Sequence, residues 1–369
     1  MKSIESKKLK ALAAGRKDTS DAIDDLLWNF GSWLTKEDDH SDVIISSRIR
    51  LARNVHGFPF PNRAKDEDLL KVINVAKEAS SRSQSLQKAL FFNITELPEW
   101  DCKYFVERRL ASPQFIENEY PNLLIVGPQE NLSIMVNEED HLRIQSIEAG
   151  LGMDSAWRKI KLLDDELENY INFSYSAKFG YLTACPTNIG TGLRASFFAH
   201  LPALSLSNRI NRVINDLPTS EIAVRGFYGE GTESVGNIFQ ISNQLTLGRT
   251  EKSVIERLIK VAQKIVDLER EARETLFKNE KIMVEDTVFR ALAILKNARI
   301  ISSLESLKLL SAVRLGCELE LIKNISRIAL NQLMVLIQPA HLQMIYKKNL
   351  NEMERDITRA DFIKQNLEI

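Results

Sequence analysis

Five arginines stand in strand-like or turn-like segments beside glycines, serines or carboxylates. They are Arg48 and Arg50 in SSRIR, Arg143 in NEEDHLR, Arg194 in GTGLRA and Arg225 in VRGFYGEG. Alternate residues of a strand project to one face, so Arg48 and Arg50 are expected side by side. Guanidinium forks bind phosphate oxygens through paired hydrogen bonds and keep their charge. The pattern predicts a triphosphate site without a GxxxxGK[ST] loop or the protein-kinase motifs. Taken singly, each arginine also fits a surface ion pair.

Carboxylates accompany these arginines in two segments. Glu138, Glu139 and Asp140 are adjacent in NEEDHLR, and Glu230 lies between two glycines in GEG. Two carboxylates facing one planar guanidinium would orient it and take its proton during attack. Such help is needed because the guanidinium pKa lies above ~12. The alternative is a solvated loop, in which adjacent carboxylates repel one another less.

Cys185 is a third candidate, placed between a strand-like segment and Pro186. A thiol near several arginines is shifted toward the reactive thiolate. The alternative is a small buried apolar side chain, and this is our interpretation of Cys102 and Cys317. No histidine pair has metal-ligand spacing. We therefore expect no metal ion held by protein side chains alone.

Composition limits the class of protein. The chain has 369 residues, 44% of them apolar, and a net charge of −1. It is long enough for about two domains, and its charge does not favour nucleic acid or an anionic membrane. No apolar run approaches the ~20 residues of a membrane helix, and the basic N-terminus lacks the apolar part of a secretory signal. The separated cysteines fit a reducing cytoplasm.

Periodicity predicts an α+β catalytic layer followed by an all-α region. Eight of the fifteen glycines lie between 180 and 248, and few helix breakers follow. We expect an N-terminal extension with a short helix over 1–41, a catalytic domain over 42–272 and a helical domain over 273–369. The strand-like runs are 42–52, 132–138, 180–185, 221–228 and 237–247. The helix-like runs are 66–80, 154–171, a long segment from about 250, 286–300, 303–313, 318–337 and 353–367.

The segments SSRIRLAR, NEEDHLRIQ, CPTNIGTGLRAS and RGFYGEG resemble the phosphagen (guanidino) kinase family over about residues 42–270. Among its members the chain is most similar to the bacterial protein-arginine kinases of the McsB type. The resemblance implies an antiparallel sheet flanked by helices, as in the glutamine synthetase catalytic domain. It also implies that ATP, with Mg²⁺, donates phosphate to arginine in proteins, which marks those proteins for degradation.

The resemblance also implies roles for single residues. Glu139 matches the catalytic carboxylate, Cys185 the substrate-site cysteine, and Glu230 a substrate-binding acid. Arg109 stands where relatives carry a histidine near the nucleotide, and Phe198 where small-molecule kinases carry another histidine. The nucleotide-contacting stretches are Ser46, Ser47, Arg48, Ile49 and Arg50; Arg143; Arg194, Ala195, Ser196, Phe197 and Phe198; and Arg225, Gly226, Phe227, Tyr228, Gly229 and Glu230.

The motif RDITRA near the C-terminus resembles the phosphoarginine-binding element of protein-arginine kinases. It comprises Arg355, Asp356, Arg359 and Ala360. On a helix Arg355 and Arg359 share a face, so both forks could take phosphoryl oxygens while Asp356 takes the guanidinium. That arrangement would let the reaction product activate the enzyme. The alternative is an ordinary solvated helix face.

Two rival functions and several partners remain open at this stage. A kinase of a free guanidino metabolite would carry a helical domain before the SSRIR strand, and here that strand begins near residue 46. An inactive adaptor that only binds phosphoarginine would not need the catalytic residues. The resemblance further implies a homodimer, a zinc-binding activator of the McsA type, a ClpC-type unfoldase and a role in stress response.

Overall fold

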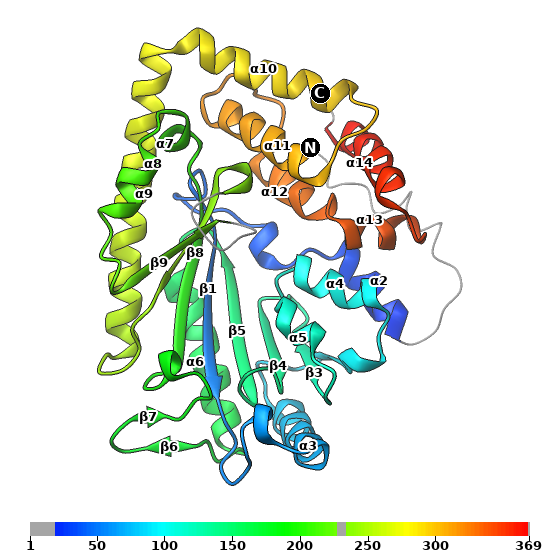
Figure 1. Cartoon of the computed structure of the whole chain (residues 1–369), viewed down its shortest axis with the longest axis vertical. Coiled ribbons are helices and arrows are strands. Elements are labelled where there is room, and N and C mark those ends of the chain that lie inside the picture. Colours follow the sequence, from blue (N-terminus) through cyan, green and yellow to red (C-terminus); the bar gives the residue numbers. More distant parts are fainter. Residues whose placement is uncertain (1–18, 227–233, 368–369) are drawn as a thin grey trace.

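The computed structural model describes residues 19–226 and 234–367. Phe227, Tyr228, Gly229 and Glu230, all assigned above to the nucleotide or substrate site, lie outside the described residues. An eight-stranded sheet with the order β2-β3-β4-β5-β1-β8-β10-β9 forms the centre of the molecule, and all its neighbouring strands are antiparallel (Figure 1). The strands are β1 (Ile44–Arg53), β2 (Leu90–Phe92), β3 (Leu123–Val126), β4 (Leu132–Val136), β5 (Leu142–Ala149), β8 (Leu193–His200), β9 (Ile222–Gly226) and β10 (Ile238–Asn243).

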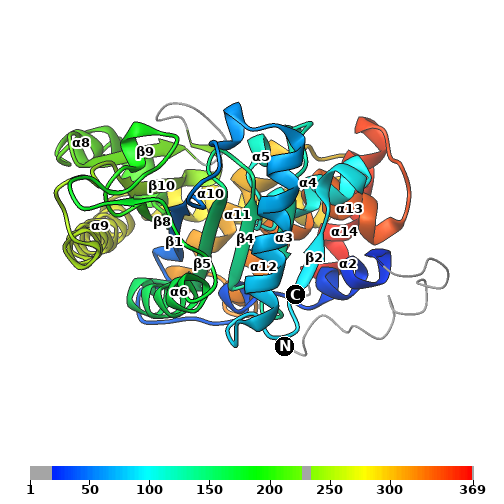
Figure 2. The same cartoon turned by 90° about the horizontal axis from the view of Figure 1, so that it is seen from below.

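The two faces of this sheet differ. One face is covered by helices α3 (Asp66–Arg82), α6 (Met153–Glu168) and α9 (Glu251–Asn279), which contact β4, β1 with β5, and β8 with β10 respectively (Figure 2). Ile49, Phe197 and Ile241 point into this core because they alternate with polar residues along their strands. On the opposite face, residues 108–112 cross β4 and β5, following α4 (Glu99–Glu107) and preceding α5 (Pro113–Glu117).

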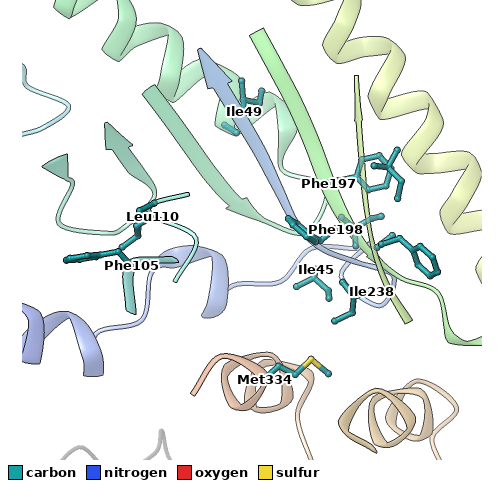
Figure 3. Packing of buried hydrophobic residues seen from close by; sticks show 14 of the residues in the cluster. Ile45, Ile49, Phe105, Leu110, Phe197, Phe198, Ile238 and Met334 are labelled. Carbon is teal, nitrogen blue, oxygen red and sulfur yellow. The ribbon is translucent and has the colours of Figure 1, made fainter. Parts of the chain in front are cut away.

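Helices gather beyond one end of the central strands (Figure 1). They are α10 (Lys281–Asn297), α11 (Ser303–Glu318), α12 (Arg327–Leu336), α13 (Pro339–Tyr346) and α14 (Glu352–Asn366). Met334 of α12 approaches the sheet near Ile45, Phe198 and Ile238 (Figure 3). Helix α9 runs unbroken through positions 272 and 273, so the division into domains stays a prediction about folding units.

Smaller elements complete the described chain. Helices α2 (Thr19–Trp28) and η2 (Ser32–Leu34) precede the sheet, and α7 (Pro202–Leu206) and α8 (Ile210–Asn215) follow β8. The short turns are η3 (Pro61–Arg63), η4 (Ile94–Glu96), η5 (Pro186–Asn188) and η6 (Val235–Asn237). A separate hairpin is formed by β6 (Tyr175–Ser176) and β7 (Gly180–Tyr181).

Most predicted elements are confirmed, but one helix and one strand differ, and several strands of the sheet were not predicted. The helix predicted over 318–337 is wrong, because Glu320 takes a left-handed φ of 57° and α12 restarts only at Arg327, capped by Ser326. The strand predicted over 180–185 is confined to two residues of β7. The sheet strands β2, β3, β5 and β8 were not predicted, although apolar residues alternate with polar ones in β5 and β8.

Candidate active site

The arginines predicted to bind phosphate lie on one face of the sheet. Arg50 of β1 stands directly opposite Arg194 of β8, so their side chains leave the backbone about 5 Å apart on the same side. Arg48, two residues earlier, projects to that side as well. The pairing registers of β5 and β9 bring Arg143 and Arg225 to it too. We call these five residues the arginine face.

Three arginines of the arginine face have a side-chain donor without an acceptor. The Nε atoms of Arg48, Arg50 and Arg194 are buried and have no hydrogen-bond partner among the described residues. Burial and then the charges of neighbouring arginines lower the pKa of Arg48 to about 9, and the same causes lower the pKa values of Arg50 and Arg194. Orphaned donors and unrelieved positive charge both call for an anion. The phosphates of ATP fit this requirement.

The three carboxylates of residues 138–140, which we call the acidic turn, have different partners. Glu138 turns inward and forms an ion pair with Arg143. Asp140 accepts hydrogen bonds from the backbone N–H of Ala184 and from Asn54 Nδ2, both at 2.6 Å. Both carboxylates are buried. They therefore fix the turn against the arginine face and against the segment that carries Cys185.

Glu139 is left exposed at the tip of this turn. Partial burial raises its pKa, and the adjacent carboxylates of Asp140 and Glu138 add to the rise. Arg143 and a hydrogen bond with Cys185 act in the opposite direction. A carboxylate with a raised pKa is a stronger base, so this position suits proton transfer from a guanidinium.

Cys185 lies beside both Glu139 and the arginine face. Its half-buried Sγ is 3.0 Å from Thr187 Oγ1, and its carbonyl accepts a hydrogen bond from Thr183 Oγ1 at 2.8 Å. The charges of Cys185 and Glu139 both act on Arg194. The place for a guanidinium is therefore adjacent to the place for a phosphate.

Arg109 approaches the arginine face from the segment that crosses it. Its guanidinium carbon lies 3.7 Å from the ring centre of Phe198 and 5.5 Å from that of Trp33. Its backbone takes a left-handed φ of 61°, and its carbonyl accepts a hydrogen bond from Gln145 Nε2 at 2.7 Å. Its charge is, after burial, the first cause of the lowered pKa of Arg48. Arg109 is thus held between aromatic rings at the edge of the predicted phosphate site.

Two comparisons of sequence agree on the family. Residues 71–272 match the family model of the ATP:guanido phosphotransferase C-terminal catalytic domain, and residues 281–369 match that of the protein-arginine kinase McsB C-terminal domain. The chain belongs to the ATP:guanido phosphotransferase family. It is 44% identical to the protein-arginine kinase of Halothermothrix orenii, over 92% of this chain and 97% of that protein. It is also 44% identical to the protein-arginine kinase of a Geobacillus species, over 92% of this chain and 94% of that protein.

Solved structures agree with this family. The duplicated taurocyamine kinase of Schistosoma mansoni, with transition-state analogue components bound, has a TM-score of 0.56 and 26% identity. The match covers 69% of this chain and 36% of that one. Lombricine kinase shares the fold, with a TM-score of 0.54 and 22% identity over 64% of this chain and 70% of that chain. The predicted fold, the predicted phosphotransferase class and the resemblance to bacterial protein-arginine kinases are confirmed.

In this guanidino phosphotransferase, several predicted nucleotide residues point away from the arginine face. Ile49, Ala195 and Phe197 are fully buried in the core on the opposite side. Ser47 donates a hydrogen bond from its Oγ to the Gly150 carbonyl at 2.7 Å. Because strands alternate, such residues can offer a nucleotide only their backbone groups. The pairing register keeps Ser46, Ser196 and Phe198 on the arginine side, and Gly226 pairs within the sheet.

Supporting residues of the site were not predicted. Asn54 donates to Asp140 and also accepts from the backbone N–H of His141, at 2.9 Å. Gln145 lies opposite Arg50 on the same side of the sheet as the arginine face. Its side-chain amide donates a hydrogen bond to the backbone carbonyl of Arg109. The position of Gln145, two residues after Arg143 in a strand, was the available signal. Nothing in the sequence around Asn54 indicated its partners, which lie 86 and 87 residues away.

The RDITRA motif occupies helix α14 in a different way from that predicted. Arg359 is buried, and it donates to the carbonyls of Ile337 and Ile301, both at 2.9 Å, and to Asp356. Arg355 donates to the Leu350 carbonyl at 2.8 Å. The buried guanidinium of Arg359 is therefore already bonded within the protein, and the phosphoarginine site stays a prediction. Local spacing could not reveal carbonyl acceptors that come from other segments.

Within residues 19–226 and 234–367, no helix is long and apolar enough to cross a membrane. In the same part of the chain, no cluster of at least three His, Cys, Asp or Glu side chains could hold a metal ion.

Proposed function

We propose that this enzyme transfers the γ-phosphate of ATP to the guanidinium group of arginine residues in proteins. The observation that carries the proposal is the arrangement of two complementary sites. The arginine face offers unpaired donors to a polyphosphate, and Glu139 with Cys185 offers a carboxylate and a thiol to a guanidinium beside it. The similarity to two protein-arginine kinases supports protein arginine as the acceptor.

The transfer is an in-line displacement. A guanidinium nitrogen attacks the γ-phosphorus as the bond to the β,γ-bridging oxygen breaks, and ADP leaves. Glu139 orients the guanidinium and takes the proton that the attacking nitrogen loses. Cys185 sits against Glu139 and helps to position the acceptor. The arginine face stabilises the charge on the transferring group, together with the Mg²⁺ that accompanies ATP.

The finer biological setting is part of the same proposal. We place the enzyme in the cytoplasm, as a homodimer that marks damaged proteins in a stress response. A zinc-binding activator of the McsA type and an unfoldase of the ClpC type are its proposed partners. Phosphoarginine is the proposed allosteric ligand, bound at α14 through Asp356 and Arg355. The carbonyl contacts of Arg359 make it a support of that site.

The test is transfer from ATP–Mg²⁺ to a reduced and alkylated protein, read by mass spectrometry without acid steps. We expect phosphoryl groups on arginine side chains and little transfer to free arginine. Efficient phosphorylation of a free guanidino compound with none on protein would support the metabolite kinase instead. Absence of any ATP turnover, with phosphoarginine still bound, would support the inactive adaptor.

A further inference from the structure

A groove lies next to the segment that carries Cys185, and the catalytic chemistry does not use it. It has a volume of about 560 Å³ and runs between the β6–β7 hairpin, the end of α6 and the start of α9. We call it the hairpin groove. Its lining includes Tyr175, Lys178, Phe179, Tyr181, Leu247 and Arg249.

The walls of the hairpin groove are tied to the Cys185 segment. Tyr181 and Gly190 exchange backbone hydrogen bonds of 2.8 and 3.3 Å. Thr246 Oγ1 donates to the carbonyls of Thr187 and Ile189 at 2.9 and 2.7 Å. A Cβ atom on Gly180 would lie 2.5 Å from the Gly190 carbonyl oxygen, so no side chain fits between the hairpin and this segment. The groove is therefore preformed and fixed in position relative to the catalytic thiol.

The rim of the hairpin groove is apolar and aromatic, although solvent reaches it. Tyr175, Phe179 and Leu247 are 62%, 45% and 58% exposed. Large exposed apolar side chains around one hollow mark a binding surface. The lining contains two basic residues, Lys178 and Arg249, and two acidic ones, Glu168 and Glu251. It therefore favours neither an anionic nor a cationic ligand. Such a lining fits polypeptide of mixed sequence better than a small charged metabolite.

The Cys185 segment connects the thiol to the rim of the groove. Cys185 Sγ contacts Thr187, and Thr187 contacts Thr246, which is adjacent to Leu247 on the rim. A polypeptide that runs from Glu139 across this segment meets the groove.

We propose that the hairpin groove binds the main chain and side chains that flank the target arginine of an unfolded protein substrate. The inference rests on the proposed function, because a free metabolite has no flanking residues. It assigns to Tyr175, Phe179 and Leu247 the recognition of polypeptide, separate from recognition of the guanidinium. The enzyme would then prefer arginine in extended, accessible segments without requiring one sequence.

The first test compares acceptors of increasing length. Acetyl-arginine amide and peptides with two and four residues on each side of one arginine are phosphorylated by the wild type and by Tyr175→Ala/Phe179→Ala. In the wild type, KM should fall as the peptide lengthens. In the double variant, KM for the longest peptide should rise about tenfold, the usual scale for loss of aromatic anchors. The KM for acetyl-arginine amide and for ATP should not change.

A matched control removes exposed apolar side chains elsewhere. Leu70→Ala/Leu162→Ala changes residues that are 50% and 56% exposed on α3 and α6, and it should keep the wild-type length dependence. A length dependence that survives in Tyr175→Ala/Phe179→Ala would overturn the groove. An equal rise of KM for the shortest and longest acceptors would also overturn it. If the wild type phosphorylates free guanidino compounds and no peptide, the proposed function itself fails.

The second test needs no variant and so does not depend on folding of one. A peptide with a photo-reactive benzophenone three residues from its arginine is irradiated on the wild-type enzyme with ADP, and the attachment sites are mapped. Attachment to residues 175–181 or 245–251 is the expected result, and excess unlabelled peptide should abolish it. Attachment elsewhere on the surface would mean that another region holds the substrate chain.

Discussion

On the arginine face, Arg48, Arg50 and Arg194 have buried Nε atoms with no acceptor among the described residues. Arg53 and Arg108, which we call the frame arginines, lie elsewhere in the molecule. Arg53 donates two hydrogen bonds to Asp164, and Arg108 donates two to Glu130. The Nε atom of these arginines thus donates to a carboxylate in one region and has no acceptor in the other. The difference indicates that the frame arginines serve the fold, and that the arginine face is kept ready for a ligand. Removing an arginine should have opposite consequences in the two regions.

The largest effect is expected on the arginine face. Arg194→Ala should lower the rate of transfer about 10³-fold or more, because arginines that stabilise phosphoryl transfer carry effects of that size. Arg225→Ala should abolish transfer as well. Thermal unfolding of either variant should occur at the wild-type temperature or slightly above it, because repulsion within the cluster falls.

Lysine at these two positions tests the geometry of the contact. Arg194→Lys and Arg225→Lys should restore little activity, since a point charge cannot replace a bidentate fork. Full rescue of both would show that charge alone matters. A large fall in the unfolding temperature of Arg194→Ala would break the comparison between the two regions.

In the frame, Arg108→Ala should chiefly lower stability. The Arg108–Glu130 pair is fully buried, so removal of one partner leaves a buried carboxylate without its counter-charge. The expected loss is about 3–5 kcal/mol in the free energy of unfolding, measured by urea titration. The matched variant Arg108→Met/Glu130→Leu should lose less, because it removes both charges. A loss for Arg108→Ala below about 1 kcal/mol would contradict the assignment.

The carboxylates of the acidic turn repeat the comparison on a smaller scale. Glu139→Gln should lower kcat about 10²-fold while ATP binding persists, whereas Glu138→Gln should disturb the position of its partner Arg143. The pKa of Glu139 is raised, and the base acts as the carboxylate. Activity should therefore fall as pH drops through this raised pKa, at a higher pH than for an ordinary glutamate. Near-wild-type kcat in Glu139→Gln would remove it from the mechanism.

The three cysteines should differ in reactivity because they differ in burial. Burial raises the pKa values of Cys102 and Cys317 to about 11, so both remain thiols at neutral pH. Cys185 is half-buried beside the acceptor site. Alkylation at neutral pH should modify Cys185 first and inactivate the enzyme, and saturating peptide acceptor should protect it. Inactivation that tracks modification of Cys102 or Cys317 would contradict the assignment.

The smallest expected effect concerns α14. Free phosphoarginine should raise activity several-fold, corresponding to a coupling of ~1–3 kcal/mol. Asp356→Ala should remove this response while ATP binding persists. Arg359→Ala should also remove it, but with a loss of stability, since the contacts of Arg359 resemble those of a frame arginine. A response that survives Asp356→Ala would place the sensor elsewhere.

Much of the catalytic layer was predictable from local patterns. The alternation in SSRIR placed Arg48 and Arg50 on one face, and the apolar stripe from Val254 to Leu268 predicted α9. Strands β5 and β8 were missed although their sequences carried the signal. Leu142 and Ile144 of β5, and Leu193, Ala195 and Phe197 of β8, alternate with polar residues as a half-buried strand requires. The polar side chains at the alternate positions are those that form the site.

The sequence by itself determined the inventory of this enzyme. It specified five arginines suited to phosphate, a turn with three carboxylates, one cysteine beside them and a helical C-terminal region. Only the tertiary structure decided which carboxylate is open. Glu138 forms an ion pair with Arg143, and Asp140 accepts hydrogen bonds from Asn54 and Ala184. Glu139 is therefore the carboxylate that remains for the acceptor. The physical reason is that adjacent, chemically equal groups differ only in their partners, and those partners come from strands and loops distant in sequence.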